Sequence, residues 1–274
     1  MTDIELCALP YDQRMASLPY PLQRKTFLGT IRPYVLIIRI MLAEYRRTWF
    51  MNIFMGFLIP FGFIFFLKSS VGTINHDRAI FLLGGNMATS IAFGPMSFLI
   101  TKLGWAKQSQ EFDYWIALPI PKLALVFAIV TVALLFALPG LVSIYIFGSV
   151  LFHLAFTNVL ALVPLIPLSI LPLAGLGALV GTYAPSGQLA GMFSNFLIIF
   201  IGFLSPMMIL PEALPVPLRI ISRFIPTTYV ADAFRAVISG QLGMNFIVDI
   251  VILTIFAILF LSLAYTRVNW RSTR

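Results

Sequence analysis

The stretch of sequence that decides the fold lies in the middle of the chain and begins LALVFAIVTVALLFALPGLVSIYIFGSVL at residues 123–151. It opens a run of 89 residues, 123–211, that contains no Asp, Glu, Lys or Arg. A water-soluble domain needs charged side chains throughout its sequence, whereas hydrocarbon penalises each charged side chain by about 3 kcal/mol. Because the whole chain is also 60% hydrophobic, we predict an all-α integral membrane protein.

The uncharged run is long enough for three membrane crossings, since each helical span needs about 20 apolar residues. Polar residues at 153–158 and turn-forming residues at 184–188 divide it. Two apolar stretches before the run and one after it are also long enough to cross. The six predicted spans are 48–67, 79–101, 123–150, 159–183, 189–210 and 246–266. An even number of crossings places both termini on the same side.

The distribution of basic residues predicts which side that is. Of the 18 Lys and Arg residues, 13 fall in the amino-terminal arm, the loop between spans two and three, and the tail. Cytoplasmic segments are enriched in Lys and Arg, so we expect a multi-pass protein of the cell (plasma) membrane with both termini in the cytoplasm. The net charge of +8 lies where lipid headgroups would be, which indicates the bilayer and no nucleic acid as its partner.

The amino-terminal region is expected to form a cytoplasmic arm at 1–29 and an amphipathic interfacial helix at 30–47, with Pro33 in its first turn. Arg32, Arg39 and Arg46 recur every seven residues and share one helical face, next to Arg47. The opposite face carries Ile31, Tyr34, Val35, Ile38, Met41, Leu42 and Tyr45. This pattern fits a helix on the inner membrane surface with its arginines near lipid phosphates, and equally a cytoplasmic helix packed on protein.

The loop at 102–122 is the longest cytoplasmic connection between spans, and its centre combines acidic and aromatic residues. The central residues are Glu111, Phe112, Asp113, Tyr114, Trp115 and Ile116. Phe112, Trp115 and Ile116 share one face of a short helix. Aromatic side chains so placed are favoured anchors in a protein groove, but they are equally typical of the belt at lipid headgroup level. The spacing alone does not choose between these interpretations.

The external segment at 211–245 is too apolar for an open loop and too interrupted for a span. We expect short helices at 218–224 and 229–239, with hydroxyls following Pro226, at Thr227 and Thr228, as caps. Together they predict a re-entrant hairpin at the outer membrane face. Asp232 and Arg235, three residues apart on the second helix, are expected to form an ion pair. The last segment, 267–274, is read as a cytoplasmic tail.

The order of these segments resembles the type 2 permease of ATP-binding-cassette (ABC) transporters over nearly the whole chain. The residues that carry the resemblance are Ala117-Leu118-Pro119-Ile120-Pro121, the segment 210–215, and Ile225-Pro226-Thr227-Thr228 leading to Arg235 and Gly240. The resemblance implies that 111–116 dock into a separate ATPase subunit. It also implies two permease subunits, here a homodimer, that export drugs, lipids or glycolipids.

The chain itself offers no site for the energy source. A phosphate-binding loop needs a Gly-Lys pair, and the sequence contains none, so we expect ATP and Mg to bind the partner subunit and this chain to hold no cofactor. We expect no enzyme and no metal site, because the sequence lacks clusters of His, Asp and Glu. The alternative is an ATP-independent secondary transporter or channel, but such proteins usually carry charged groups at mid-membrane, and 123–211 has none.

Polar and flexible residues within the spans are candidates for a substrate path. They are Asn52, Asn86, Asn195, Met207 and Met208. Asparagines in spans more often bond to neighbouring helices, and methionines often face lipid, so both interpretations stay open. Gly177 and Gly181, like Gly187 and Gly191, have the spacing that allows close helix packing, either within the subunit or between subunits.

Overall fold

The computed structural model describes residues 27–47, 49–71, 75–109, 111, 122–154, 158–207 and 215–267. In these ranges every regular element is a helix. The helices are α3 (Phe27–Glu44), the 3-10 helix η1 (Tyr45–Arg47), α4 (Trp49–Val71), α5 (His76–Gln108), α7 (Lys122–Leu151), α8 (Val159–Tyr183), α9 (Gly187–Leu204), α10 (Val216–Ser222), α11 (Pro226–Ser239) and α12 (Met244–Arg267). The predictions on Phe112, Asp113, Tyr114, Trp115, Ile116 and Met208, and those on the side chains of Arg32 and Asn52, fall outside the described residues.

The long helices occupy the predicted spans. Within the described ranges, α5, α7, α8, α9 and α12 are the five helices that are long and apolar enough to cross a membrane. The 23-residue helix α4 occupies the region predicted as the first span. The chain is therefore a multi-pass helical membrane protein, while the number of six crossings stays a prediction.

Two predicted boundaries are wrong. Helix α9 ends at Leu204 and not at residue 210, because Pro206 lacks the backbone N–H that the next turn needs. Helix α5 extends to Gln108, so residues 102–108 of the predicted loop are helical. The two lysines in this extension, Lys102 and Lys107, are bonded to neighbouring segments, which offsets the cost of carrying charge there.

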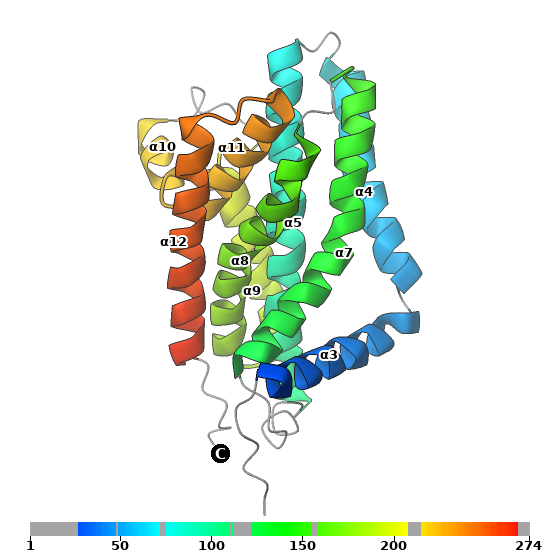
Figure 1. The fold of residues 1–274 in the computed structure, drawn as a ribbon, viewed down its shortest axis with the longest axis vertical. Coiled ribbons are helices and arrows are strands. Elements are labelled where there is room, and N and C mark those ends of the chain that lie inside the picture. The colour runs from blue at the N-terminus through cyan, green and yellow to red at the C-terminus, as the bar shows by residue number, and fades with distance from the viewer. Residues whose placement is uncertain are drawn as a thin grey trace, which may run out of the picture.

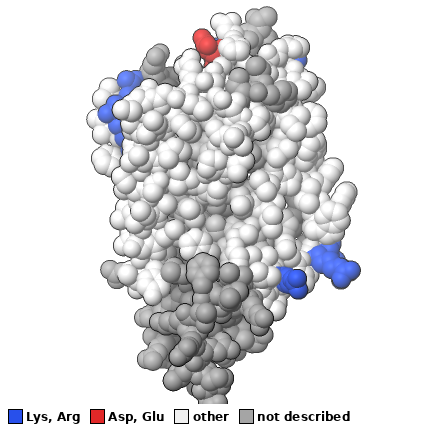
Figure 2. Space-filling view, in the orientation of Figure 1, with Lys and Arg blue, Asp and Glu red and all other residues white. Residues whose placement is uncertain are grey.

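The elements divide between the two ends of the molecule. In Figure 1 the long helices run along the longest axis, and α3 lies across the end where α7 begins and α12 finishes. Helices α10 and α11 lie at the opposite end. Figure 2 shows Lys, Arg, Asp and Glu near the ends of this face, with an uncharged band between them. Such a band is the surface that a helical membrane protein presents to lipid.

The packing of α3 agrees only in part with the predicted apolar face. Its buried stripe is Ile37 and Met41, flanked by half-buried Tyr34 and Ile38, whereas Val35 is exposed. This stripe packs on α7, where the Tyr34 and Thr131 hydroxyls are 2.7 Å apart. The heptad of arginines therefore indicated the exposed side of α3 correctly. It did not reveal Ile37, which lies three residues after Tyr34 and four residues before Met41 and so shares their face.

The boundaries of the predicted interfacial helix, 30–47, are also wrong. Helix α3 begins at Phe27, which places Pro33 in its second turn, and Arg46 and Arg47 belong to η1. The helix ends at Glu44 because that carboxylate bonds to Lys102 and the next side chain, Tyr45, packs between Phe98 and Phe136. These contacts tighten the backbone into a 3-10 turn before α4.

Helices α5 and α8 approach one another so closely that only glycine fits between them. A Cβ atom added at Gly177 would lie 2.9 Å from the Met96 carbonyl oxygen, and one at Gly181 would lie 3.0 Å from Leu103 Cβ. Gly187 packs in the same way against the Trp105 ring, whereas a Cβ at Gly191 would meet nothing within 4 Å. Gly177 and Gly181 thus serve packing within the subunit.

This close contact leads to the first prediction. We expect Gly177→Ala to lower the free energy of unfolding by about 1–3 kcal/mol relative to Gly94→Ala, because the new methyl group overpacks the α5–α8 contact. Gly94 is a matched control, since it lies in helix α5 and a Cβ there meets nothing within 4 Å. Thermal unfolding of the two variants in detergent measures the difference. Equal unfolding temperatures would contradict the inferred role of the contact.

Candidate functional site

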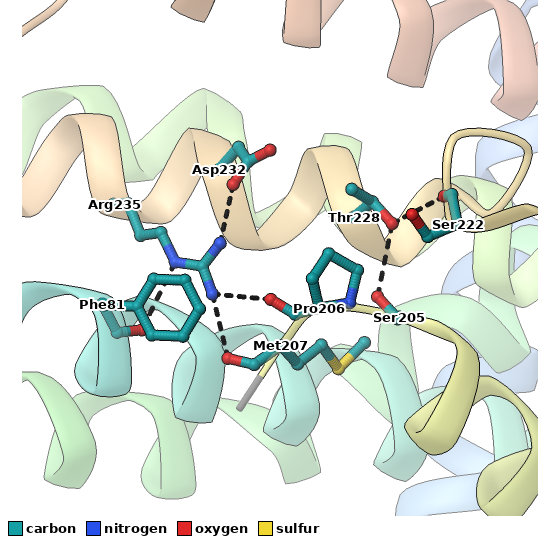
Figure 3. A network of polar contacts seen from close by, with 8 residues as sticks. All are labelled: Phe81, Ser205, Pro206, Met207, Ser222, Thr228, Asp232 and Arg235. Carbon is teal, nitrogen blue, oxygen red and sulfur yellow. Dashed lines mark hydrogen bonds and ion pairs between the residues drawn. The ribbon is translucent and has the colours of Figure 1, made fainter. Parts of the chain in front are cut away.

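Arg235 on α11 bonds to three segments at one end of the bundle (Figure 3). Its Nη1 donates to Asp232 Oδ1 at 2.7 Å, and its Nη2 donates to the carbonyl oxygens of Pro206 and Met207, both at 2.9 Å. Its Nε donates to the Phe81 carbonyl at 3.3 Å, and the guanidinium carbon lies 3.7 Å from the Phe81 ring centroid. Only the planar, five-donor arginine side chain can satisfy acceptors in so many directions.

Arg235 is deeply placed, with 12% of its side chain exposed. Burial lowers the pKa of Arg235, whereas the Asp232 carboxylate raises it, and the guanidinium keeps its charge. The predicted Asp232–Arg235 ion pair is confirmed. The carbonyl partners at Phe81, Pro206 and Met207 were not foreseen, because every residue carries a carbonyl and no sequence pattern distinguishes these.

Two adjacent glycines on α5 make room for this network. A Cβ atom at Gly84 would lie 2.5 Å from Arg235 Cγ, and one at Gly85 would collide with the Met207 carbonyl oxygen. This glycine pair was not predicted, although neighbouring glycines inside a span are a signal of close backbone approach. The segment after α9 can therefore lie directly against α5.

The predicted capping by Thr227 and Thr228 is wrong. Helix α11 begins at Pro226, and its N-cap, Ile225, makes no side-chain capping bond. Proline at the first helical position lacks one of the N–H groups that a cap would satisfy. The Thr228 hydroxyl instead donates to the Ser222 carbonyl at 2.7 Å and lies 3.4 Å from the Ser205 hydroxyl.

The neighbouring residues Thr227 and Tyr229 differ in their hydrogen bonding. Thr227 is fully buried, and its hydroxyl has no hydrogen-bond partner among the described residues. The Tyr229 hydroxyl donates to the Arg223 carbonyl at 2.7 Å, and burial raises the pKa of Tyr229. Helix α11 ends, as predicted, at Gly240, whose φ of 77° favours glycine. The structure thus has two successive short helices, here called the α10–α11 unit, where the hairpin was predicted; α10 packs on α9 and α11 packs on α5, α8 and α12, and the re-entrant character stays a prediction.

A cavity of about 450 Å³ adjoins the Arg235 network. It lies between the start of α5, helix α11 and the start of α12, and Asp232, Arg235, Asn245 and Asp249 are among its lining residues. The Arg235 charge is already paired with Asp232, so Asp249 adds a second carboxylate to the lining. The cavity is therefore a polar hollow at this end of the molecule.

Lys102 on α5 joins two acidic residues at the opposite end. Its Nζ lies 2.8 Å from Glu44 Oε2, at the end of α3, and 3.4 Å from Glu111 Oε2. Glu111 is the one predicted coupling residue that falls within the described ranges. Tyr45, which follows Glu44 in the chain, lies 5.6 Å from Phe98 and 5.2 Å from Phe136, measured between ring centroids. Burial raises the pKa of Tyr45, and the Lys102 charge opposes this effect.

The same end of α5 is also bonded to the turn between α8 and α9. Lys107 Nζ donates to the carbonyl oxygens of Thr182 and Ala184, at the end of α8. Gln108 Oε1 accepts a hydrogen bond of 3.1 Å from the Gly187 backbone N–H, at the start of α9. A cation at the carboxyl end of a helix is favourable because the last carbonyls carry partial negative charge. Residues 102–108 are thus a junction of four helices.

The described candidate path residues divide between the interior of the bundle, where Met207 packs beside the α5 turn that carries Asn86, and the exposed face of α9. Asn86 is 5% exposed, and its Nδ2 has no hydrogen-bond partner among the described residues. Met207 is buried, and its sulfur accepts a hydrogen bond of 3.4 Å from the Thr89 hydroxyl. Asn195 is exposed on α9. Of the arginines predicted on the interfacial helix, Arg39, Arg46 and Arg47 are exposed.

Comparison with protein families identifies the type of protein. Residues 78–266 match the family described as ABC-2 family transporter protein. The match covers more than half of the chain and runs from the start of α5 to the end of α12. Comparison with curated proteins gives no match.

The Arg235 network leads to the second prediction. We expect Arg235→Lys to lower the free energy of unfolding by about 2–3 kcal/mol, because one ammonium group cannot replace the bonds to Asp232 and three carbonyls. Arg223→Lys is the matched control, since the Arg223 side chain is exposed at the end of α10. Thermal unfolding in detergent measures both, and similar losses in the two variants would contradict the role given to Arg235.

Proposed function

Because the chain belongs to the ABC-2 family of transporter proteins, we propose that it is the permease subunit of an ABC exporter. In this proposal it moves a hydrophobic or amphipathic substrate, such as a drug, lipid or glycolipid, out across the cell membrane. The family match over residues 78–266 carries the proposal. The long apolar helices in the same region support it.

We further propose that a separate ATPase subunit supplies the energy. The sequence has no Gly-Lys pair for a phosphate-binding loop, so ATP and Mg would bind the partner. Residues 111–116 would dock into that ATPase, as the resemblance implies. The position of Glu111 just beyond the end of α5, the helix against which α7, α8, α9 and α11 pack, supports this assignment.

The exposed face of α9 supports a second permease subunit. Asn195 lies near the middle of this 18-residue helix and is exposed together with Met192, Phe196 and Ile199. An amide that faces hydrocarbon at mid-membrane lacks hydrogen-bond partners, which costs free energy. A second copy of the chain facing α9 would enclose a path lined by Asn195. In contrast, Asn86 and Met207 would reach that path only after the helices rearrange.

The membrane topology of the proposal has both termini in the cytoplasm, with α4 as the first of six spans. Exposed Arg39, Arg46 and Arg47 would then lie near lipid phosphates of the inner leaflet. The α10–α11 unit and the Arg235 network would lie at the outer end, where their rearrangement would release substrate. This arrangement agrees with the opposite positions of α3 and α11 in the molecule (Figure 1).

The central test replaces the proposed coupling residues. We expect Trp115→Ala combined with Glu111→Lys to abolish co-purification of the ATPase subunit and to reduce ATP-dependent dye export from vesicles more than tenfold. Phe65→Ala combined with Asp77→Lys is the matched control, since both residues are exposed in other parts of the chain. Full transport by the coupling variant would contradict the assignment. Transport without ATP that stops when ion gradients collapse would instead indicate a secondary transporter.

A cross-linking experiment tests the second subunit. With Cys7 replaced by Ser, we expect Asn195→Cys to form a covalent dimer with a short bis-maleimide in native membranes. Ile258→Cys, exposed on α12, is the control and should stay monomeric, because the exposed face there carries mainly aliphatic side chains that suit lipid. Equal cross-linking at both positions, or none at Asn195, would contradict a dimer that encloses α9.

A further inference from the structure

Lys102 is an unusual residue for its position. It lies on α5 with only 8% of its side chain exposed, and its Nζ bonds to both carboxylate oxygens of Glu44 at 3.0 and 2.8 Å. Glu111, beyond the end of the same helix, supplies the second carboxylate at 3.4 Å. An ammonium group is buried at a cost unless such partners accompany it.

The two partners belong to different parts of the molecule. Glu44 is the last residue of α3, which packs on α7 through Ile37 and Met41. Glu111 begins the set of residues proposed to contact the ATPase. Lys102 is thus a bridge between the helix that lies across the bundle and the start of the coupling loop.

Stability alone does not account for this bridge. Glu44 and Glu111 have 50% and 39% of their side chains exposed, and ion pairs with exposed partners typically contribute below about 1 kcal/mol. An apolar side chain at position 102 would avoid the cost of burying an ammonium group. The feature that an apolar side chain could not reproduce is the link between Glu44 and Glu111.

Neighbouring contacts attach the ends of α3 and α5 to other helices, so that a movement at the link can pass to them. Tyr45 packs between Phe98 and Phe136, which fixes the end of α3 to α5 and α7. Lys107 and Gln108 fix the same end of α5 to the turn between α8 and α9. A displacement of Glu111 would therefore move α3 and α5 together and would reach the turn before α9.

We propose that Lys102 is a positioning residue that makes the coupling loop and α3 move as one unit through its bonds to Glu111 and Glu44. The inference rests on the proposed function, since it assumes that a partner ATPase acts on the loop. The link raises the amount of substrate transported per ATP hydrolysed. Loss of the link leaves the complex assembled and hydrolysing ATP while less of that hydrolysis moves substrate.

The test measures substrate transported per ATP hydrolysed by the full permease–ATPase complex in proteoliposomes. We expect Lys102→Met to lower this ratio at least threefold without loss of co-purified ATPase. Lys102→Arg, which keeps the charge, should recover most of the ratio. Lys68→Met is the matched control, because Lys68 is exposed at the far end of α4 and bonds only to the Leu151 carbonyl in the part of the chain that the structure describes.

A double-mutant cycle separates a link from independent effects. We expect Glu44→Gln to lower the ratio in the wild-type background and to have no further effect when Lys102→Met is already present. Glu44 is half-exposed, so its replacement tests the link even if changes at the buried Lys102 impair folding. An unchanged ratio in Glu44→Gln, or an equal loss in both backgrounds, would overturn the inference.

These outcomes are distinguishable from failure of the proposed function. If wild-type protein transports substrate without ATP, the proposed function itself is wrong. If transport is ATP-driven and the ratio in Lys102→Met and Glu44→Gln equals that of wild type, only the positioning role of Lys102 is wrong. A change confined to thermal unfolding, with the ratio intact, would likewise reduce Lys102 to a structural role and overturn the inference.

Discussion

The close contact between α5 and α8 is the constraint on which the rest of the structure depends. Glycines on α8 bring the two backbones together, and this places α5 in the interior, with α7, α9 and α11 packed around it. A central helix can transmit a movement from one end of the bundle to the other only if both of its ends are attached. In this chain charged side chains make those attachments, at the two places where the apolar band stops.

The two attachments use different chemistry. At one end Lys102 meets carboxylates, so the contact depends on which side chains face it. At the other end Arg235 meets mainly backbone carbonyls, so the contact depends on where the chain runs. In the proposed exporter the first end would receive movement from the ATPase and the second would hold the outer end of α9. Between them the helices carry almost no charge, as hydrocarbon requires.

The sequence predicted those features that depend on composition or on short spacing. The spans followed from uncharged runs, and the Asp232–Arg235 pair followed from its separation of three residues. Lys102 bonds to Glu44, and Arg235 bonds to the carbonyls of Pro206 and Met207. These bonds join residues far apart in sequence, and no local sequence pattern predicts them. On α3 the arginine heptad indicated the exposed side, but contact with α7 decides which apolar residues are covered, so Ile37 was missed and Val35 was wrongly placed on the buried side.

The Arg235 contacts have a consequence for how such a protein can evolve. The guanidinium recognises the carbonyls of Pro206 and Met207, and a carbonyl is present whatever amino acid occupies the position. The residue at 207 can therefore change its side chain without losing the anchor, provided that the backbone path is kept. Selection can alter the chemistry beside α9 while the attachment of the segment is inherited unchanged, which separates adaptation to a new cargo from the integrity of the fold.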